Sequence, residues 1–260
     1  MRLGLSSAAF YGRLETEDAA EKLRDFPVAC CEIFLETWSE YSSDFGKTVR
    51  ERLRFLPCRS IHAKGLQFEG DLFGASEKQR RDAFRLLENV LDCGAALGAG
   101  VWVFHGPPDV RSGLAPNRIR GLSDTLGRVC RMAGERGMVM AWENVSWCAL
   151  KSPEDAKYLM EACPALAFTL DIKQAKLTGV DPFAFLPVLG SRLAHVHVLD
   201  WDEGGRLCLP GQGSFDFPRF FQALADMGYQ GDIILEPYAA QAEDEAALAQ
   251  SLIFLRSLLP

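Results

Sequence analysis

The 260-residue sequence lacks the signatures of several common classes of protein. It has no CxxC pair, no apolar run long enough to cross a bilayer, and neither of the glycine-rich phosphate loops, GxGxxG and the Walker motif. Its first residues also lack the apolar stretch and small-residue cleavage site of a signal peptide. We therefore expect a cytoplasmic protein with no membrane partner. The missing phosphate loop disfavours a doubly wound open sheet.

The sequence also has fewer basic than acidic residues. Lys and Arg number 28 against 35 Asp and Glu, which gives a net charge of −7. Such a chain has no general attraction for a phosphate backbone, so we expect no nucleic-acid partner, while an oligomer is left open. The eight cysteines mostly fall in apolar segments, and Cys30 and Cys31 are adjacent. This pattern indicates reduced core residues rather than a disulfide framework.

What the sequence does contain is a repeat of strand-like and helical segments. Apolar runs recur about every 30 residues, and most are followed by a stretch with helical periodicity that starts at a capping residue such as Ser152 or Asp216. We predict strands at residues 3–7, 30–36, 60–63, 101–106, 139–145, 167–172, 194–200 and 233–238. Eight such units close a single (β/α)8 TIM barrel, so we expect one α/β domain over residues 1–260.

Four of the predicted strands end in a chemically active side chain. Glu143, Asp171, His197 and Glu236 continue the inward-facing parity of their strands, so in a parallel barrel they converge at one point. Three carboxylates and one imidazole suit a divalent cation such as Mn, Mg, Co or Zn, and three like charges need a countercharge. The alternative is that these carboxylates are simply paired, with Lys173 as the counter-ion of Asp171.

The remaining histidines also lie in predicted strands. His62 and His105 end theirs, so they are candidates for substrate contacts or, with Glu143 as a bridge, for a second metal site; core histidines bonded to backbone are the plain alternative. His195 lies one layer deeper and suits that plain role. In the strand at residues 30–36, either Glu32 or Glu36 is expected to face the barrel interior and bond a histidine or substrate.

The residues at these strand ends resemble a known family. The segments SIHA, VFHG, WENVSW, FTLDIKQA, HVHVLD, LPGQGSFDF and GYQGDIILEPY resemble, in order and spacing, the xylose isomerase-like TIM-barrel superfamily of sugar phosphate isomerases and epimerases, to which the endonuclease IV family is related. The resemblance covers essentially the whole chain. It implies that Glu143, Asp171, His197 and Glu236 are metal ligands of the ketose 3-epimerase type, with Glu143 and Glu236 also acting as the acid–base pair.

Departures from the two relatives are informative. The Asp-x-x-His pairing of endonuclease IV becomes Asp171-x-x-Gln174, and its Asp-Arg-His motif falls on Gly205-Arg206-Leu207, so its third metal site is missing. The ketose epimerases often have an arginine where this chain has Glu203.

The leading hypothesis is therefore a metal-dependent isomerase or epimerase of a small sugar or related polyol-carbonyl compound, with one divalent cation. His62, His105, Lys173 and Arg206 are its candidate substrate contacts. A two-metal hydrolase and a non-catalytic sugar-binding barrel are the alternatives.

Overall fold

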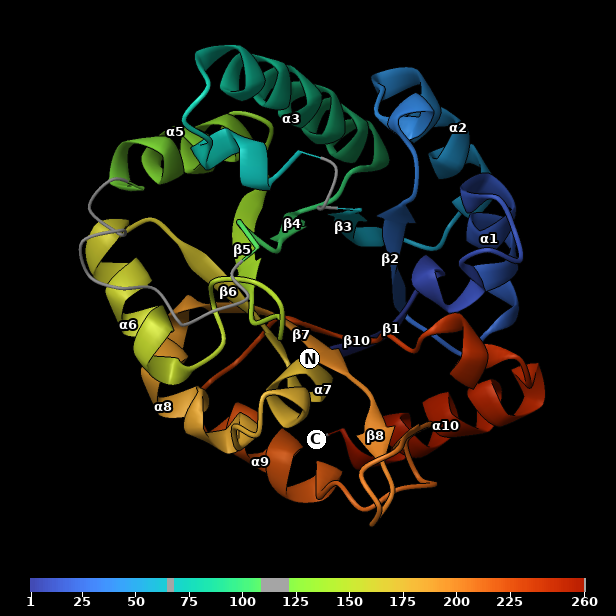
Figure 1. The fold of residues 1–260 in the computed structure, drawn as a ribbon. Helices are drawn as coiled ribbons and strands as arrows, with labels where there is room; N and C mark the ends of the chain where they lie inside the picture. Colours follow the sequence, from blue (N-terminus) through green and yellow to red (C-terminus); the bar gives the residue numbers. More distant parts are fainter. Residues whose placement is uncertain (65–67, 109–121, 260) are drawn as a thin grey trace.

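The computed structural model describes residues 1–64, 68–108 and 122–259. Eight parallel strands close a barrel in the order β1-β10-β7-β6-β5-β4-β3-β2, which confirms the predicted TIM barrel (Figure 1). The barrel strands are β1 (Arg2–Ser6), β2 (Cys30–Leu35), β3 (Cys58–Ala63), β4 (Val101–Phe104), β5 (Val139–Glu143), β6 (Ala167–Asp171), β7 (Leu193–Val198) and β10 (Asp232–Leu235).

Helices surround this barrel on all sides (Figure 1). The α-helices are α1 (Thr16–Lys22), α2 (Ser43–Leu53), α3 (Glu77–Leu97), α5 (Ser123–Gly134), α6 (Pro153–Ala162), α7 (Ile172–Leu177), α8 (Leu186–Leu189), α9 (Phe217–Asp226) and α10 (Glu245–Leu258). Short 3-10 segments are η1 (Ser7–Phe10), η2 (Leu23–Asp25), η3 (Trp38–Glu40), η5 (Gly70–Phe73), η6 (Pro182–Ala184), η7 (Gly190–Arg192) and η8 (Ala239–Ala242). No helix in the described parts of the chain combines the length and apolarity needed to cross a membrane.

The predicted helix starts follow from their caps. The Ser152 hydroxyl accepts from the Asp155 N–H while the Asp155 carboxylate accepts from the Ser152 N–H, which is a complete capping box with Pro153 in the first turn. Asp216 accepts from the Arg219 N–H in the same way. The apolar stripe of α3 includes Leu87, which is fully buried against the barrel. Local capping and periodicity therefore decide where these helices begin and which face packs inward.

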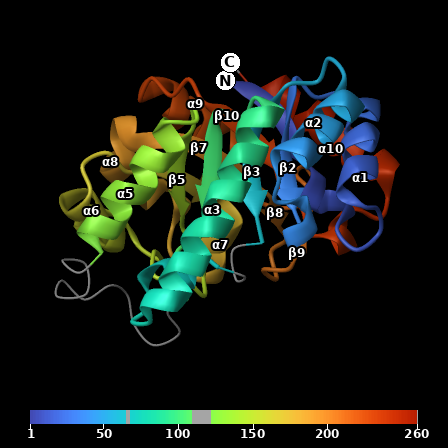
Figure 2. The same cartoon turned by 90° about the horizontal axis from the view of Figure 1, so that it is seen from above.

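Several barrel strands are shorter than predicted at their C-terminal ends. The segment predicted to run through residue 200 ends at Val198, and residues Asp200–Trp201 (β8) instead pair with Leu207–Cys208 (β9) in a separate two-stranded sheet. The Asp200 carboxylate organises this excursion because it accepts from the backbone N–H groups of Gly211, Gly213 and Phe215. In the side view, β8 and β9 lie at the end of the barrel opposite to the two chain termini (Figure 2).

Gly106 lies two residues beyond the end of β4, at a position where a larger side chain does not fit. Its φ of +80° lies in the left-handed region, and the indole of Trp142 occupies the space that a Cβ would take. The same indole donates from Nε1 to the carbonyl of His105, 2.8 Å away. The glycine and the tryptophan together therefore fix the backbone of the residue whose imidazole enters the site.

We predict that Gly106→Ala destabilises the fold more than Gly98→Ala. Gly98 has nearly the same φ, +79°, but no heavy atom lies within 4 Å of the position that an added methyl group would take. Gly98→Ala should cost roughly 1 kcal/mol for the backbone conformation alone, and Gly106→Ala about 1–3 kcal/mol more for the collision with Trp142. Urea unfolding of the two variants measures the difference, and equal costs would show that the indole moves aside freely.

Candidate active site and metal centre

Four predicted residues meet at the C-terminal mouth of the barrel. Glu143 and Asp171 are the last residues of β5 and β6, His197 lies near the end of β7, and Glu236 directly follows β10. One ligand atom from each lies within 4.8 Å of the others, and all four side chains are buried. The strand register explains this convergence, because Asp171 pairs with His197 in the β6–β7 ladder and His197 pairs with Ile234 in the β10–β7 ladder.

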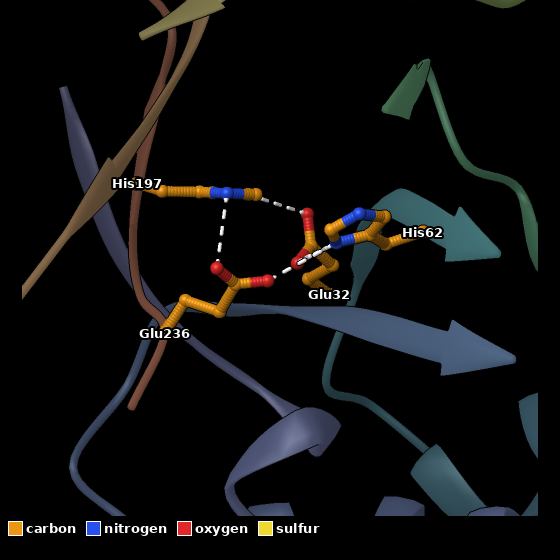
Figure 3. Close-up of side chains that lie close together, drawn as sticks. All are labelled: Glu32, His62, His197 and Glu236. Atoms are coloured by element: carbon orange, nitrogen blue, oxygen red, sulfur yellow. Dashed lines mark hydrogen bonds and ion pairs between the residues drawn. The ribbon is translucent and has the colours of Figure 1, made fainter. Parts of the chain in front are cut away.

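The two nitrogens of His197 face different carboxylates. Its Nδ1 lies 2.9 Å from Glu143 Oε1 and 3.4 Å from Glu236 Oε2. Its Nε2 lies 3.0 Å from Glu32 Oε2, on the other side of the ring (Figure 3). An imidazole that donates its second N–H to a carboxylate is held in the tautomer and orientation that a metal ligand needs. Glu32 is therefore a positioning residue for His197.

Glu32 is the member of the predicted pair Glu32 and Glu36 that faces the interior. It is fully buried, accepts from the Ser60 hydroxyl at 2.8 Å, and lies 3.2 Å from His195 Nε2. This hydrogen-bonded layer lies beneath the four converging residues. His195 thus has the supporting role expected for a deeper histidine, although its partners are side chains rather than backbone.

Glu36 lies outside the barrel interior, where burial and the charges of Glu40 and Glu15 raise its pKa to about 7 from an ordinary value of 4.5. The folded state keeps the proton of the Glu36 carboxyl to a higher pH than the unfolded chain does. The free energy of unfolding therefore falls as the pH rises from about 4.5 to about 7. Glu36→Gln keeps the size of the side chain and cannot ionise.

We therefore predict that Glu36→Gln melts at a higher temperature than the wild type at pH 8, and that the difference disappears near pH 4. Thermal unfolding followed by circular dichroism at both values tests this. A difference that does not depend on pH would mean that ionisation of Glu36 is not the cause.

His62 and His105 form a second group beside the first. Their Nε2 atoms are 2.7 Å apart, and Glu143 Oε2 lies 3.7 Å and 3.6 Å from them. His62 Nδ1 also lies 3.1 Å from Glu236 Oε1. Glu69, which the sequence did not single out, fixes the end of β4 because its carboxylate accepts from the backbone N–H of His105 at 2.8 Å. Both histidines therefore belong to the site and are not core histidines bonded to backbone carbonyls.

Lys173 supplies a positive charge within the same site. Its Nζ lies 2.9 Å from Glu236 Oε2 and 3.3 Å from Asp171 Oδ2, and it lies over the ring of Tyr238. The counter-ion alternative for Asp171 thus has a geometric basis. Lys173 and a metal ion would share the same two carboxylates.

The donor atoms of the site fit a divalent cation. Asp171 Oδ1 accepts from the Gln174 N–H. Among the described residues, the buried Oδ2 receives no hydrogen bond and has an ion pair with Lys173 alone. The side-chain amide of Asn144 holds the backbone of Asp171 by two hydrogen bonds of 2.8 Å. Its Nδ2 donates to the Asp171 carbonyl, and its Oδ1 accepts from the Asp171 N–H. A rigidly held, buried carboxylate oxygen without a hydrogen bond is suited to a hard cation.

The electrostatics of the site show how much negative charge it holds. Burial disfavours a charged His62, yet its hydrogen bonds to Glu236 and Glu32 raise its pKa to about 10. Burial also raises the pKa of Asp171, to about 7, against the opposing charge of Lys173. Burial similarly disfavours a charged His197, but the Glu32 and Glu236 carboxylates raise its pKa well above the ordinary value. A cation bound here would displace a proton, because a ligating imidazole must be neutral.

A cavity of about 500 Å³ opens onto these groups. Of the predicted residues, His62, His105, Glu143, Lys173 and Glu236 line it. Sequence reasoning did not foresee most of the rest of the wall, which is Ala8, Tyr11, Phe34, Lys64, Val145, Trp147, Gln174, Pro237, Tyr238, Ala239 and Ala240. These residues follow or precede several different strands, so their convergence depends on the closed barrel.

Arg206 is not among the residues that line the cavity. It belongs to the turn between β8 and β9, is exposed, and bonds to the carboxylate of Asp202 through Nε and Nη2 at 2.8 Å each. The backbone N–H of Arg206 bonds to the same carboxylate. The structure therefore does not bring Arg206 together with the other candidate substrate contacts, because the unforeseen β8–β9 sheet carries it outward.

The family described as xylose isomerase-like TIM barrel matches residues 20–258. The chain belongs to this family. Inosose dehydratase of Clostridium tetani is 26% identical over 153 residues, which cover 51% of this chain and only 50% of that protein. Fructoselysine 3-epimerase of Escherichia coli O157:H7 is 24% identical over 194 residues, covering 71% of this chain and 70% of that protein.

Several solved structures share the whole fold of this chain. D-psicose 3-epimerase in the presence of D-fructose has a TM-score of 0.81 at 16% identity, covering 100% of this chain and 99% of that one. The 3-keto-D-glucoside 4-epimerase from E. coli has a TM-score of 0.77 at 20% identity, covering 99% of both chains. At these identities the likeness establishes that this xylose isomerase-like protein has the common barrel.

We predict that Lys173→Met binds Mn²⁺ more tightly than the wild type does. The substitution removes one positive charge from beside Glu236 and Asp171 but keeps a flexible side chain of similar length. A unit charge this close in a buried site is worth more than about 1.4 kcal/mol, so Kd should fall by about tenfold or more. Titration calorimetry at neutral pH measures it. Lys176→Met is the control, since that ammonium lies over Trp201 instead, and unchanged affinity in Lys173→Met would separate the lysine from the metal site.

Proposed function

We propose that the protein is a metal-dependent isomerase or epimerase of a sugar or related polyol-carbonyl compound, working through an enediolate. The observation that carries this proposal is the placement of Glu143 and Glu236 in one buried cluster at the cavity. They come from strands that are three steps apart around the barrel, in the order β10-β7-β6-β5. The sugar epimerases among the relatives support the same class of reaction.

Glu143, Asp171, His197 and Glu236 are the residues that would hold the cation. When bound, a divalent cation supplies positive charge that stabilises the oxygen on which charge develops as a proton leaves the neighbouring carbon. We propose one ion per chain, and the three-oxygen, one-nitrogen donor set suits Mn, Mg, Co or Zn.

The proton transfers are the work of the two glutamates. Each has a carboxylate that opens onto the cavity, and their different strands bring them toward a substrate from different sides. One can remove the carbon-bound proton and the other can return one to the opposite face, which is what epimerisation requires. His62, 3.1 Å from Glu236, and Lys173, 2.9 Å from it, both orient that carboxylate and are our candidates for contacts with substrate oxygens.

A second candidate function has an observation in its favour. His62, His105 and Glu143 form their own group of potential ligands, so a two-metal hydrolase with Glu143 as the bridge is chemically reasonable. Elemental analysis of purified protein separates the two proposals, because one bound metal per chain favours the epimerase and two favour the hydrolase. A barrel that only binds sugar would take up ligand without exchanging any of its protons with solvent.

The proposed reaction predicts separate effects on rate and on metal. Glutamine preserves the size and one coordinating oxygen of each glutamate but removes its basicity. We expect Glu143→Gln and Glu236→Gln to retain appreciable Mn²⁺ while exchange of carbon-bound protons with heavy water slows by on the order of 100-fold or more. NMR of a panel of ketohexoses and 3-keto-glycosides with Mn²⁺-loaded protein measures the exchange.

Two further variants complete this experiment. Glu203→Gln alters an exposed glutamate in the β8–β9 turn and should exchange protons at the wild-type rate. His197→Ala should lose the metal while the fold persists. Near-normal exchange in Glu143→Gln or Glu236→Gln with metal still bound would remove that glutamate from proton transfer.

A further inference from the structure

A groove of about 760 Å³ lies on the outside of the barrel, away from the site described above. It runs between α5 and the connection from α6 to β6, and Val139, the first residue of β5, lies in its wall. Glu143, at the other end of the same strand, belongs to the cavity at the mouth. The groove is therefore at the opposite end of β5 from the candidate active site.

Two cysteines meet in this groove. Cys130 is half-buried in α5, Cys163 is buried at the C-terminal end of α6, and their Sγ atoms are 3.8 Å apart. The two elements are also joined by the Ser123 hydroxyl, which donates to the Ala162 carbonyl at 2.7 Å. The two sulfurs therefore meet where α5 is joined to the C-terminal end of α6.

The surroundings of Cys163 favour its thiolate. Donation by the Cys130 thiol lowers the pKa of Cys163 to about 6, and the backbone N–H groups of Ala165 and Leu166 contribute in the same direction. The guanidinium of Arg192 adds positive charge and is held in place by the carbonyl of Leu166. The pKa of Cys130 is raised by the same contact. One thiolate beside one thiol is the pairing found in reactive dithiols.

A second pair of cysteines provides a contrast. Cys31 and Cys58 are register partners in the β2–β3 ladder, and both are buried. Burial raises the pKa of Cys31 well above its ordinary value. Neither residue lines the groove between α5 and α6. The pair in the groove differs from this one because both of its cysteines line an open groove and one of them has a stabilised thiolate.

We propose that Cys130 and Cys163 are a redox-active dithiol that hydrogen peroxide entering the groove converts to a disulfide. The Cys163 thiolate attacks one peroxide oxygen, so an S–O bond forms, the O–O bond breaks, and the leaving hydroxide takes a proton to become water. The Cys130 sulfur then attacks the sulfenic sulfur. The S–S bond forms, the S–O bond breaks, and the second oxygen leaves as hydroxide, which takes the proton of the Cys130 thiol to become water. Two electrons pass from the sulfurs to the peroxide.

The disulfide would join positions 33 residues apart in the chain. It would tie α5, which leads into β5, to the connection that leads into β6. These two strands carry Glu143 and Asp171 at their far ends. The modification therefore acts on the scaffold of two neighbouring βα units and uses no residue of the candidate active site. It is independent of the function proposed above.

Peptide mapping of the full-length protein after brief treatment with hydrogen peroxide tests the proposal. We expect the free-thiol count of the wild type to fall by two and its intact mass to fall by the mass of two hydrogens. Cys130 and Cys163 should be found in one linked peptide, and a dithiol reductant should restore both thiols. Cys208→Ser, which removes a half-exposed single cysteine, should behave like the wild type. Cys130→Ser and Cys163→Ser should form no disulfide under the same conditions.

The wild-type map alone can overturn the proposal. It is wrong if Cys130 and Cys163 remain reduced while Cys208 is modified, or if the linked peptide joins other cysteines such as Cys31 and Cys58. Because serine at the buried position of Cys163 can disturb packing, Cys163→Ala serves as the second variant, with circular dichroism as the check of its fold. Disulfide formation that persists in a folded Cys163→Ala protein would equally contradict the assignment.

Discussion

Four buried carboxylates at one end of the barrel are the constraint on which the site depends. Glu32, Glu143, Asp171 and Glu236 are each no more than 7% exposed, so solvent screens their mutual repulsion poorly. Among the described residues, positive charge reaches them from Lys173 and from imidazoles such as that of His197. An array of this kind persists only if positive charge balances it, and that requirement makes the same array suited to a cation.

The barrel and the convergence of four site residues could be predicted from sequence because both follow from regular spacings of apolar residues along the chain. The repeat of strand and helix gives the number of strands, and the alternation within a strand gives the inward parity of Glu143 and Asp171. The family resemblance is confirmed by the match over residues 20–258. The roles of the site residues remain predictions, since the structure shows their proximity and not their chemistry.

The features that could not be predicted depend on register and on contacts between distant segments. Parity leaves Glu32 and Glu36 equivalent, and only the depth at which β2 pairs with β3 places Glu32 beside Ser60. The sequence around Arg206 has no pattern that predicts the β8–β9 sheet, so its position away from the barrel mouth could not be foreseen. The expectation of reduced cysteines agrees with the structure, whereas the contact of Cys130 with Cys163 depends on how α5 packs against the end of α6 and has no signal in the sequence.

Glu143 connects the two candidate reactions, because its two oxygens face different imidazoles. Oε1 lies beside His197, and Oε2 lies near both His62 and His105. A carboxylate that binds one cation through one oxygen keeps a second oxygen able to accept a proton. If both oxygens bind cations, two positive charges depress its pKa and it becomes a poor base. The number of cations at the mouth therefore decides whether Glu143 can move a proton, and a second ion at His62 and His105 would favour hydrolysis at the expense of epimerisation.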